Sequence, residues 1–189
     1  MNPVDYKKLV SVGAIIGIVV IVTLAFAKNI TLGLNFDTLG LAGTAATLDW
    51  ILWGIFREKL WKLKILHSWL VLIPNLGGKW HGTLRWKDAT TNEFHKKEVL
   101  LLIKQTLTRI TLDMKTDEMK SKSSSASIFY DGHRNEVGVE YTYESTPETL
   151  IRERNPIHYG TTHLEYKNGE LVGEYWTSRR TIGEIKLIR

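Results

Sequence analysis

The stretch HYGTTHLEYKNGELVGEYWT, residues 158–177, decides the fold of most of this chain. Two runs of alternating apolar and polar residues flank the dipeptide Asn168–Gly169. Alternation with a period of two is typical of a half-buried strand, and Asn-Gly between two such runs is a strong sequence signal for a β-hairpin. The stretch therefore predicts two antiparallel strands, His158–Lys167 and Glu170–Ser178.

The same pattern continues through the whole region that follows IPNLGG, residues 73–78. Short polar turns such as DATTN (88–92) and YDGHRN (130–135) separate the runs. Six further strands are predicted: Lys79–Lys87, Lys97–Thr106, Arg109–Thr116, Lys122–Tyr130, Glu136–Glu144 and Ile182–Ile188. Eight consecutive strands with local turns predict an up-and-down antiparallel β-barrel, because closure removes the exposed edge strands. A barrel of eight strands is just wide enough to be filled by side chains or to hold one small ligand.

Alternation also assigns side chains to the barrel interior. The inward sets are apolar at one end, but Tyr, Thr, His and Arg accumulate along three of the strands, which a purely hydrophobic core does not need. We take these polar residues as a candidate ligand site: Tyr141, Tyr143, His158, Thr162, Tyr175, Thr177 and Arg179. A structural role is the alternative. The tyrosines and His158 then belong to the core, and Arg179 or Arg189 closes the barrel by stacking on Trp80.

One connection, Ser145–Ile157, is longer than the others and carries Arg152 and Arg154. Long loops at barrel mouths often cover ligands, and Pro147 favours a helical turn after it. Arginine forks bind phosphate and tyrosine faces stack on bases, so this loop beside inward tyrosines suits a small anionic ligand with aromatic rings. The alternative is a solvated loop in which two glutamates balance the arginines.

The N-terminal third contains two long apolar runs. Leu9–Ala27 has no charge in nineteen residues, and Leu39–Phe56 has one in eighteen. Each run is long enough to cross a bilayer, the first spanning roughly 28 Å as a helix. The sequence therefore predicts three regions: a transmembrane hairpin with a basic juxtamembrane segment (1–64, helices 9–27 and 39–56), a linker (65–76) and the barrel domain (77–189).

Lysines and arginines flank the outer ends of the two runs, whereas the short connection between them has one lysine. The positive-inside rule then places the N-terminus and the barrel in the cytoplasm. A cleaved signal peptide that ends at Ala27 is the alternative, and it leaves the barrel on the same side.

Asp49 lies within the second apolar run, on a face of small residues. A carboxylate at membrane depth is costly, so it faces a protein partner or water, or snorkels toward the headgroups. Gly13, Gly17 and Gly43 belong to small-xxx-small patterns that permit close helix contact. These faces pack the hairpin within one chain, or they also pack neighbouring chains. As a hypothesis, Asp49 is tolerated because the membrane part works as an assembly.

Composition excludes several classes of protein. The 189 residues carry a net charge of +5, of which +3 falls in residues 1–64, so the remainder is nearly balanced and does not suit a nucleic-acid polymer. Cysteine is absent, which excludes disulfides and thiol catalysis. No catalytic motif and no metal-ligand spacing is recognisable. The sequence predicts a protein that is not an enzyme and has no metal or cofactor.

The barrel region opens with GGKWHGTLRW (77–86) and closes with GEYWTSRRTIGEIKL (173–187). With two preceding transmembrane helices, the chain resembles the two-transmembrane, β-strand-rich effectors of bacterial CBASS anti-phage defence, which are CD-NTase-associated proteins with a minimal β-barrel. The resemblance implies a cyclic dinucleotide as ligand, a CD-NTase as its source, and oligomerisation on binding. It further implies that the helices then disrupt the lipids of the bacterial inner membrane and kill the cell. The competing hypothesis is a constitutive membrane-anchored scaffold whose barrel binds a lipid or a protein.

Overall fold

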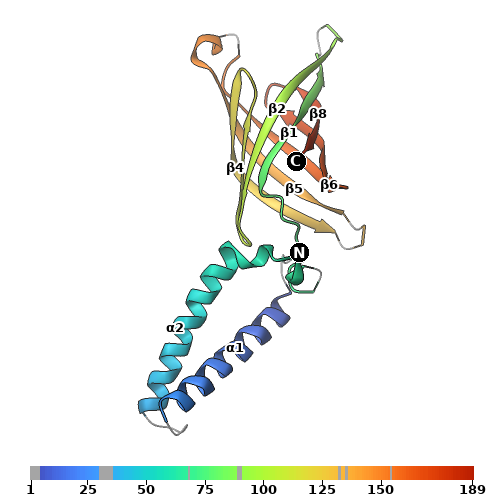
Figure 1. Ribbon diagram of the computed structural model, residues 1–189. Helices are drawn as coiled ribbons and strands as arrows, with labels where there is room; N and C mark the ends of the chain where they lie inside the picture. The colour runs from blue at the N-terminus through green and yellow to red at the C-terminus, as the bar shows by residue number, and fades with distance from the viewer. Residues whose placement is uncertain are drawn as a thin grey trace. The chain divides into compact units, whose positions relative to one another are not determined.

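The structure is a computed structural model that describes residues 5–29, 36–67, 69–88, 91–131, 133–134, 136–153 and 155–189. The chain divides into two compact units, a helical unit, Asn2–Leu72, and a β-barrel unit, Ile73–Arg189. Figure 1 shows the helices of the first unit and the strands of the second.

The helical unit contains two long helices, α1 (Tyr6–Ala27) and α2 (Phe36–Glu58), followed by the 3-10 turns η1 (Leu60–Lys62) and η2 (Lys64–Leu66). Both long helices are apolar and long enough to cross a membrane, by length and composition. The first starts one turn earlier than predicted, because the Asp5 side chain caps it by accepting a hydrogen bond from the Lys8 backbone N–H at 3.2 Å.

Small residues form the contact between α1 and α2. The buried side chains of this contact are Ala25, Leu41 and Ala45. Gly17 lies against Asp49, since a Cβ atom on Gly17 would stand 2.8 Å from Asp49 Oδ2. Asp49 therefore occupies room that Gly17 provides within the same hairpin. Among the described residues, nothing lies within 4 Å of a Cβ built on Gly13 or Gly43, so both glycines remain open on the helix surfaces.

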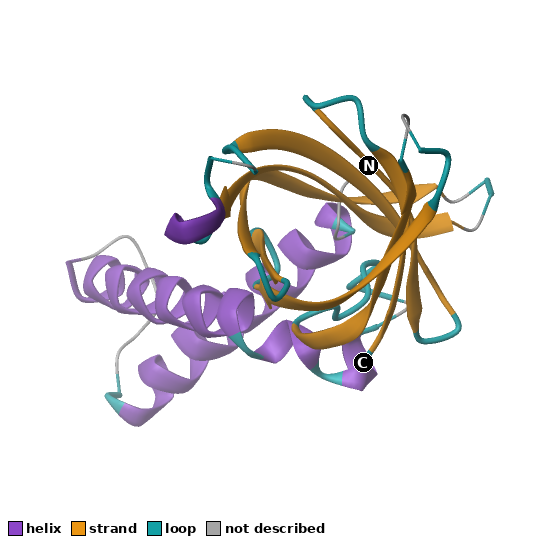
Figure 2. Cartoon of the chain, turned by 90° about the horizontal axis from the view of Figure 1, so that it is seen from above, coloured by secondary structure: helices purple, strands orange, loops and turns teal. Residues whose placement is uncertain are grey.

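The second unit is a closed barrel in which each strand pairs with the next and β8 pairs with β1, all antiparallel (Figure 2). Its strands are β1 (Gly78–Lys87), β2 (Phe94–Gln105), β3 (Ile110–Lys115), β4 (Met119–Asp131), β5 (Glu136–Pro147), β6 (His158–Lys167), β7 (Glu170–Thr177) and β8 (Ile182–Ile188). The predicted fold class, a helical hairpin followed by an eight-stranded up-and-down barrel, is confirmed.

The barrel core follows the predicted alternation. Inward residues from all eight strands form one cluster around Leu101, Val139, Leu164 and Leu187, which are fully buried. Three strands are longer than predicted at their ends: β2 starts at Phe94, β4 at Met119, and β5 reaches Pro147. These ends continue the backbone pairing beyond the core, as Lys87 pairs with Phe94 and Met119 with Pro147. Each of these ends adds only three residues, which is too short a run for side-chain alternation to predict the pairing.

One end of the barrel, called the closed end, is sealed by the segment Pro74–Gly77. Leu76 is fully buried; its carbonyl accepts a hydrogen bond from Trp80 Nε1 at 2.8 Å, and its N–H donates to Gln105 Oε1 at 2.7 Å. The Gln105 amide also donates to the Pro74 carbonyl. The Arg189 guanidinium donates to the carbonyls of Asn75 and Gly77. These polar groups at the closed end are therefore engaged in hydrogen bonds within the barrel unit.

Candidate functional site

The opposite end of the barrel, called the mouth, contains a cavity of about 170 Å³. It lies where the strands leave the core, and residues of strands β1–β7 and of their connections line it. The lining residues are Leu84, Trp86, Lys97, Met114, Thr116, Glu118, Met119, Ser121, Tyr143, Ser145, Asn155, His158, Tyr175, Thr177, Arg179 and Thr181. Polar and aromatic groups thus converge in this cavity, as they do in small-molecule sites.

The structure brings five of the predicted site residues together in this cavity: Tyr143, His158, Tyr175, Thr177 and Arg179. Tyr141 and Thr162 point into the barrel as expected but are fully buried below the cavity, so they do not line it.

The long loop contributes differently from the prediction. It contains the expected helical turn, η3 (Thr149–Ile151). Arg152 is exposed and is not a lining residue; its guanidinium lies 3.5 Å from the Pro147 carbonyl. Arg154 lies outside the described residues. The loop residue that lines the mouth is Asn155, which composition did not single out, because a lone asparagine after an arginine-rich run carries no sequence signal.

Arg179 is held at the mouth by side chains. Its guanidinium donates to Asn155 Oδ1 at 2.5 Å and lies 3.4 Å from His158 Nε2. Asn155 is itself anchored, because its N–H donates to the Ile151 carbonyl and its amide contacts Met119 Sδ. Of the structural alternative, Arg189 does help to close the opposite end, but through hydrogen bonds to backbone carbonyls, and the described ring contact of Trp80 is with the edge of Tyr166. Arg179 therefore presents its charge to the mouth.

His158 is neutral at physiological pH. Burial lowers its pKa below the ordinary value of 6.5, and the nearby Arg179 guanidinium lowers it further, against a hydrogen bond between Nδ1 and the Pro156 carbonyl at 3.1 Å. A carbonyl accepts only, so Nδ1 carries the proton and Nε2 is free to accept from Arg179. The neutral ring thus orients the arginine without adding charge.

The two tyrosines of the mouth are also uncharged. Burial raises the pKa of Tyr175 to about 12, with Arg179 opposing it, and raises the pKa of Tyr143 further. Both rings offer flat faces and neutral hydroxyls. Tyr143 is backed by Tyr141, whose ring centroid lies 5.8 Å away. Such a pair of aromatic walls suits a planar group such as a base.

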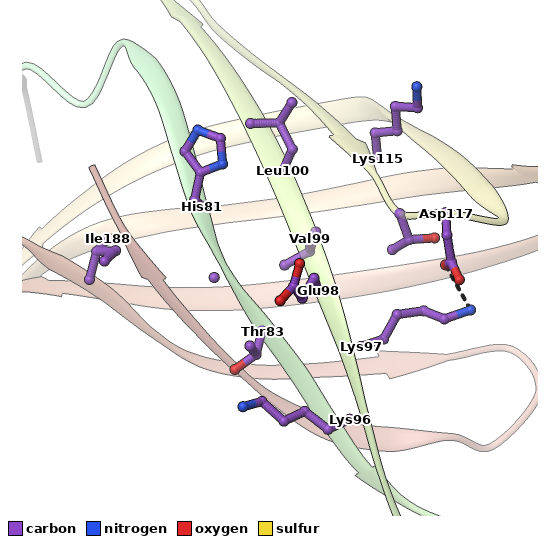
Figure 3. A pocket seen from close by; sticks show the side chains of 12 residues that line it. His81, Thr83, Lys96, Lys97, Glu98, Val99, Leu100, Lys115, Asp117 and Ile188 are labelled. Atoms are coloured by element: carbon purple, nitrogen blue, oxygen red, sulfur yellow. Dashed lines mark ion pairs between the residues drawn. The ribbon is translucent and has the colours of Figure 1, made fainter.

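A second cation of the mouth, Lys97, was missed by the sequence analysis. Its ammonium lies 2.6 Å from Glu118 Oε2. It also lies 2.9 Å from Asp117 Oδ1, the pair drawn in Figure 3. Partial burial lowers the pKa of Lys97, but the two carboxylates outweigh it, so the pKa lies above its ordinary value. The signal was present, because Lys97 precedes Val99, Leu101 and Ile103 in the inward register of β2. The acidic residues of the β3–β4 turn thus form ion pairs with this cation.

Two buried hydroxyls lie beneath the cavity without hydrogen-bond partners among the described residues, Tyr141 Oη and Thr162 Oγ1. The two residues are paired across β5 and β6, and burial raises the pKa of Tyr141 to about 12, with the Thr162 hydroxyl opposing it. Buried hydroxyls normally find partners. Polar groups therefore lie inside the barrel below the cavity as well as around it.

A larger hollow of about 800 Å³ lies on the outer wall of the barrel, where His81, Thr83, Lys96, Leu100 and Ile188 face outward (Figure 3). Besides outward residues of β1, β2 and β8, it is lined by Lys115 of β3 and by the β3–β4 turn, and it shares Lys97 and Thr116 with the rim of the mouth. Among the described residues there is no group of three metal-ligating side chains. The mouth is the place where aromatic faces and a directed cation meet.

Comparison with known proteins agrees with this geometry. The family model described as "Cap15, cyclic dinucleotide receptor domain" matches residues 71–189, which include every strand of the barrel. The CD-NTase-associated protein 15 of Staphylococcus schleiferi is 32% identical over 132 residues, covering 70% of this chain and 69% of the relative. The protein of the same name from Yersinia aleksiciae is 33% identical over 148 residues, covering 73% of this chain and 65% of the relative, just under two thirds. On the matched domain and both relatives, the chain belongs to the Cap15 cyclic dinucleotide receptor family.

Proposed function

We propose that this chain is a membrane-anchored CBASS effector whose barrel binds a cyclic dinucleotide made by a partner CD-NTase. The observation that carries the proposal is the mouth, where Arg179 is held beside the walls formed by Tyr143 and Tyr175. A cyclic dinucleotide offers two phosphates and two bases. The arginine suits a phosphate oxygen, and the tyrosine faces suit a base.

The cavity takes part of the ligand. At about 170 Å³ it is smaller than the roughly 300–1,000 Å³ of most small-molecule pockets. We infer that one base and its adjoining phosphate enter the mouth, while the remainder lies across the rim beside Asn155 and Lys97. Arg152 of the long loop stays part of the proposal, although it does not line the cavity, and Arg154, which lies outside the described residues, stays a candidate from the sequence alone.

The chain acts as a receptor, not as an enzyme, in this proposal. The tyrosine pKa values are raised and the His158 pKa is lowered, so these side chains are neutral beside the Arg179 guanidinium, while the second cation, Lys97, is paired with Asp117 and Glu118. No nucleophile–base pair is placed there among the described residues. This chemistry supports binding of an anion without turnover and needs no cofactor beyond the ligand.

In this proposal, the two helices act on the membrane after the ligand binds. We propose that α1 and α2 cross the bacterial inner membrane with both ends in the cytoplasm, as their basic flanks favour. Ligand binding shifts the chain toward an oligomer, to the extent that the oligomer binds ligand more tightly than the monomer does. The open glycines Gly13 and Gly43 allow close contact between neighbouring hairpins, whereas Gly17 and Asp49 hold each hairpin together. The gathered helices then disrupt the bilayer.

Titration calorimetry of the full chain in detergent tests the proposal with a panel of cyclic di- and trinucleotides. One cyclic dinucleotide is expected to bind, and Arg179→Gln is expected to weaken it by about tenfold or more, because a charge-assisted hydrogen bond is lost. Arg180→Gln is the matched control, since Arg180 adjoins Arg179 but does not line the mouth. If no nucleotide binds the folded chain, the scaffold hypothesis takes its place.

A further inference from the structure

The outer wall of the barrel is divided into two halves of opposite charge. Outward residues of β1–β4 include eight Lys and Arg and three Asp and Glu, a net charge of +5. Outward residues of β5–β8 include seven Glu and two Lys, a net charge of −5. We call these the basic half and the acidic half. Because the barrel is closed in chain order, the two halves lie on opposite sides of it.

Each half carries a hollow with apolar residues between charged ones. On the basic half, Leu100 lies in the 800 Å³ hollow with Lys96 and Lys115 around it, and Ile188 of the adjacent strand β8 borders the same hollow (Figure 3). On the acidic half, a hollow of about 710 Å³ contains Val172 and Trp176 with Glu165 and Glu174 around them. Val172 is 41% exposed and Trp176 is 46% exposed. An apolar centre with a charged rim is the usual anatomy of a protein interface, and tryptophan is enriched among its anchors.

We propose that the basic half of one barrel docks on the acidic half of a second copy of this chain, head to tail. The inference rests on the proposed function in that the docked form is the oligomer that the ligand favours. The chain itself provides both charges in equal number, which makes a second copy the matching partner. A pair joined this way leaves one basic half and one acidic half uncovered, so assembly continues into a ring or a row.

Contacts between two halves of like charge are disfavoured. Two copies that meet basic half to basic half, or acidic half to acidic half, bring like charges together, which costs several kcal/mol at an interface. Long-range attraction between unlike halves also weakens with salt, since the Debye length falls from about 8 Å at 0.15 M to about 3 Å at 1 M. Head-to-tail assembly should therefore be sensitive to ionic strength.

Charge reversal on each half tests this inference with the full chain in detergent. Lys96→Glu with Lys115→Glu lowers the net charge of the basic half from +5 to +1, and Glu165→Lys with Glu174→Lys changes that of the acidic half from −5 to −1. By sedimentation velocity, each double variant is expected to self-associate at least about tenfold more weakly than the unmodified chain at saturating nucleotide. Lys167→Glu with Lys186→Glu is the matched control, because it changes the net charge equally but adds negative charge to the acidic half. Its assembly is expected to be undiminished.

Mixing the two charge-reversed variants provides a second test of the interface that needs no nucleotide. The Lys96/Lys115 variant and the Glu165/Glu174 variant carry different affinity tags. At low salt, each is expected to capture the other at least about tenfold more than it captures itself, and 1 M salt should abolish this mutual capture. Equal capture in mixed and unmixed samples would overturn the inference, as would assembly that stops at dimers or ignores the reversals. Calorimetry on the same samples reports nucleotide binding separately, so failure of the proposed function is distinguishable from failure of the interface.

Discussion

Each end of the barrel contains an arginine, and the two guanidinium groups differ in their hydrogen-bond partners. At the closed end, Arg189 donates to the backbone carbonyls of Asn75 and Gly77. At the mouth, Arg179 contacts only side chains among the described residues, Asn155 and His158. Backbone carbonyls of a packed segment cannot move away, whereas side chains on a loop can exchange their partner for a ligand. The difference supports our proposal that the mouth binds the ligand, whereas the closed end stabilises the barrel.

Removing a tryptophan from each end should reveal this difference most strongly. Trp80 is 1% exposed and hydrogen-bonded to Leu76, whereas Trp86 at the mouth is half-buried and stacks on His95. Trp80→Ala is expected to lower the free energy of unfolding by about 3–5 kcal/mol, and Trp86→Ala by less than half as much. Urea unfolding of the full chain in detergent, followed by circular dichroism, measures both. Equal losses would mean that the mouth is as tightly packed as the closed end.

Neutralising one acid of the β3–β4 turn should increase the affinity of the mouth for its nucleotide. Asp117 is ionised at neutral pH, since its hydrogen bond to Lys97 lowers its pKa below the ordinary value. Asp117→Asn removes a negative charge beside a cation of the mouth and is expected to tighten cyclic dinucleotide binding by about threefold.

Asp113→Asn is the control for that variant. Asp113 lies on the neighbouring strand but pairs with Lys104 on the outer wall, 3.7 Å away. Its neutralisation should leave nucleotide affinity unchanged in the same calorimetric titration. If both variants tighten binding equally, the effect comes from net charge alone and Lys97 has no local role.

A smaller effect should appear in the pH dependence of stability. His158 has a folded pKa below 6.5, so the unfolded chain binds its proton first as pH falls. The contribution of neutral His158 is therefore fully present above about pH 6.5 and is lost as pH falls toward the folded pKa. His158→Gln keeps a polar side chain without this titration. Its stability, measured by urea unfolding between pH 7.5 and 5, should fall less than that of the unmodified chain; parallel curves would contradict the assignment.

The barrel could be predicted from the sequence because alternation and turn residues are local signals. His158, Tyr175 and Thr177 followed from inward register on their own strands, and the structure brings them together. Lys97 was missed because the inward residues that follow it on β2, Val99, Leu101 and Ile103, are apolar and indicate a core strand. Asn155 could not be found, because its place depends on how the loop after η3 folds back toward Arg179. Strand register is a local property, whereas loop placement depends on contacts distant in sequence.

The smallest expected effect concerns the hydroxyls beneath the mouth. Tyr141 Oη is buried without a partner among the described residues, so Tyr141→Phe removes a group that has paid its desolvation cost and gained no hydrogen bond. The free energy of unfolding should stay equal or rise by up to about 1 kcal/mol. Ser121→Ala is the control, since the Ser121 hydroxyl lies 2.8 Å from the Ser145 hydroxyl and its loss should cost about 1 kcal/mol. A comparable loss in Tyr141→Phe would show that the tyrosine belongs to a structural hydrogen-bond network with Thr162. In that case the boundary between the stabilising end of the barrel and the binding end lies directly beneath Tyr143.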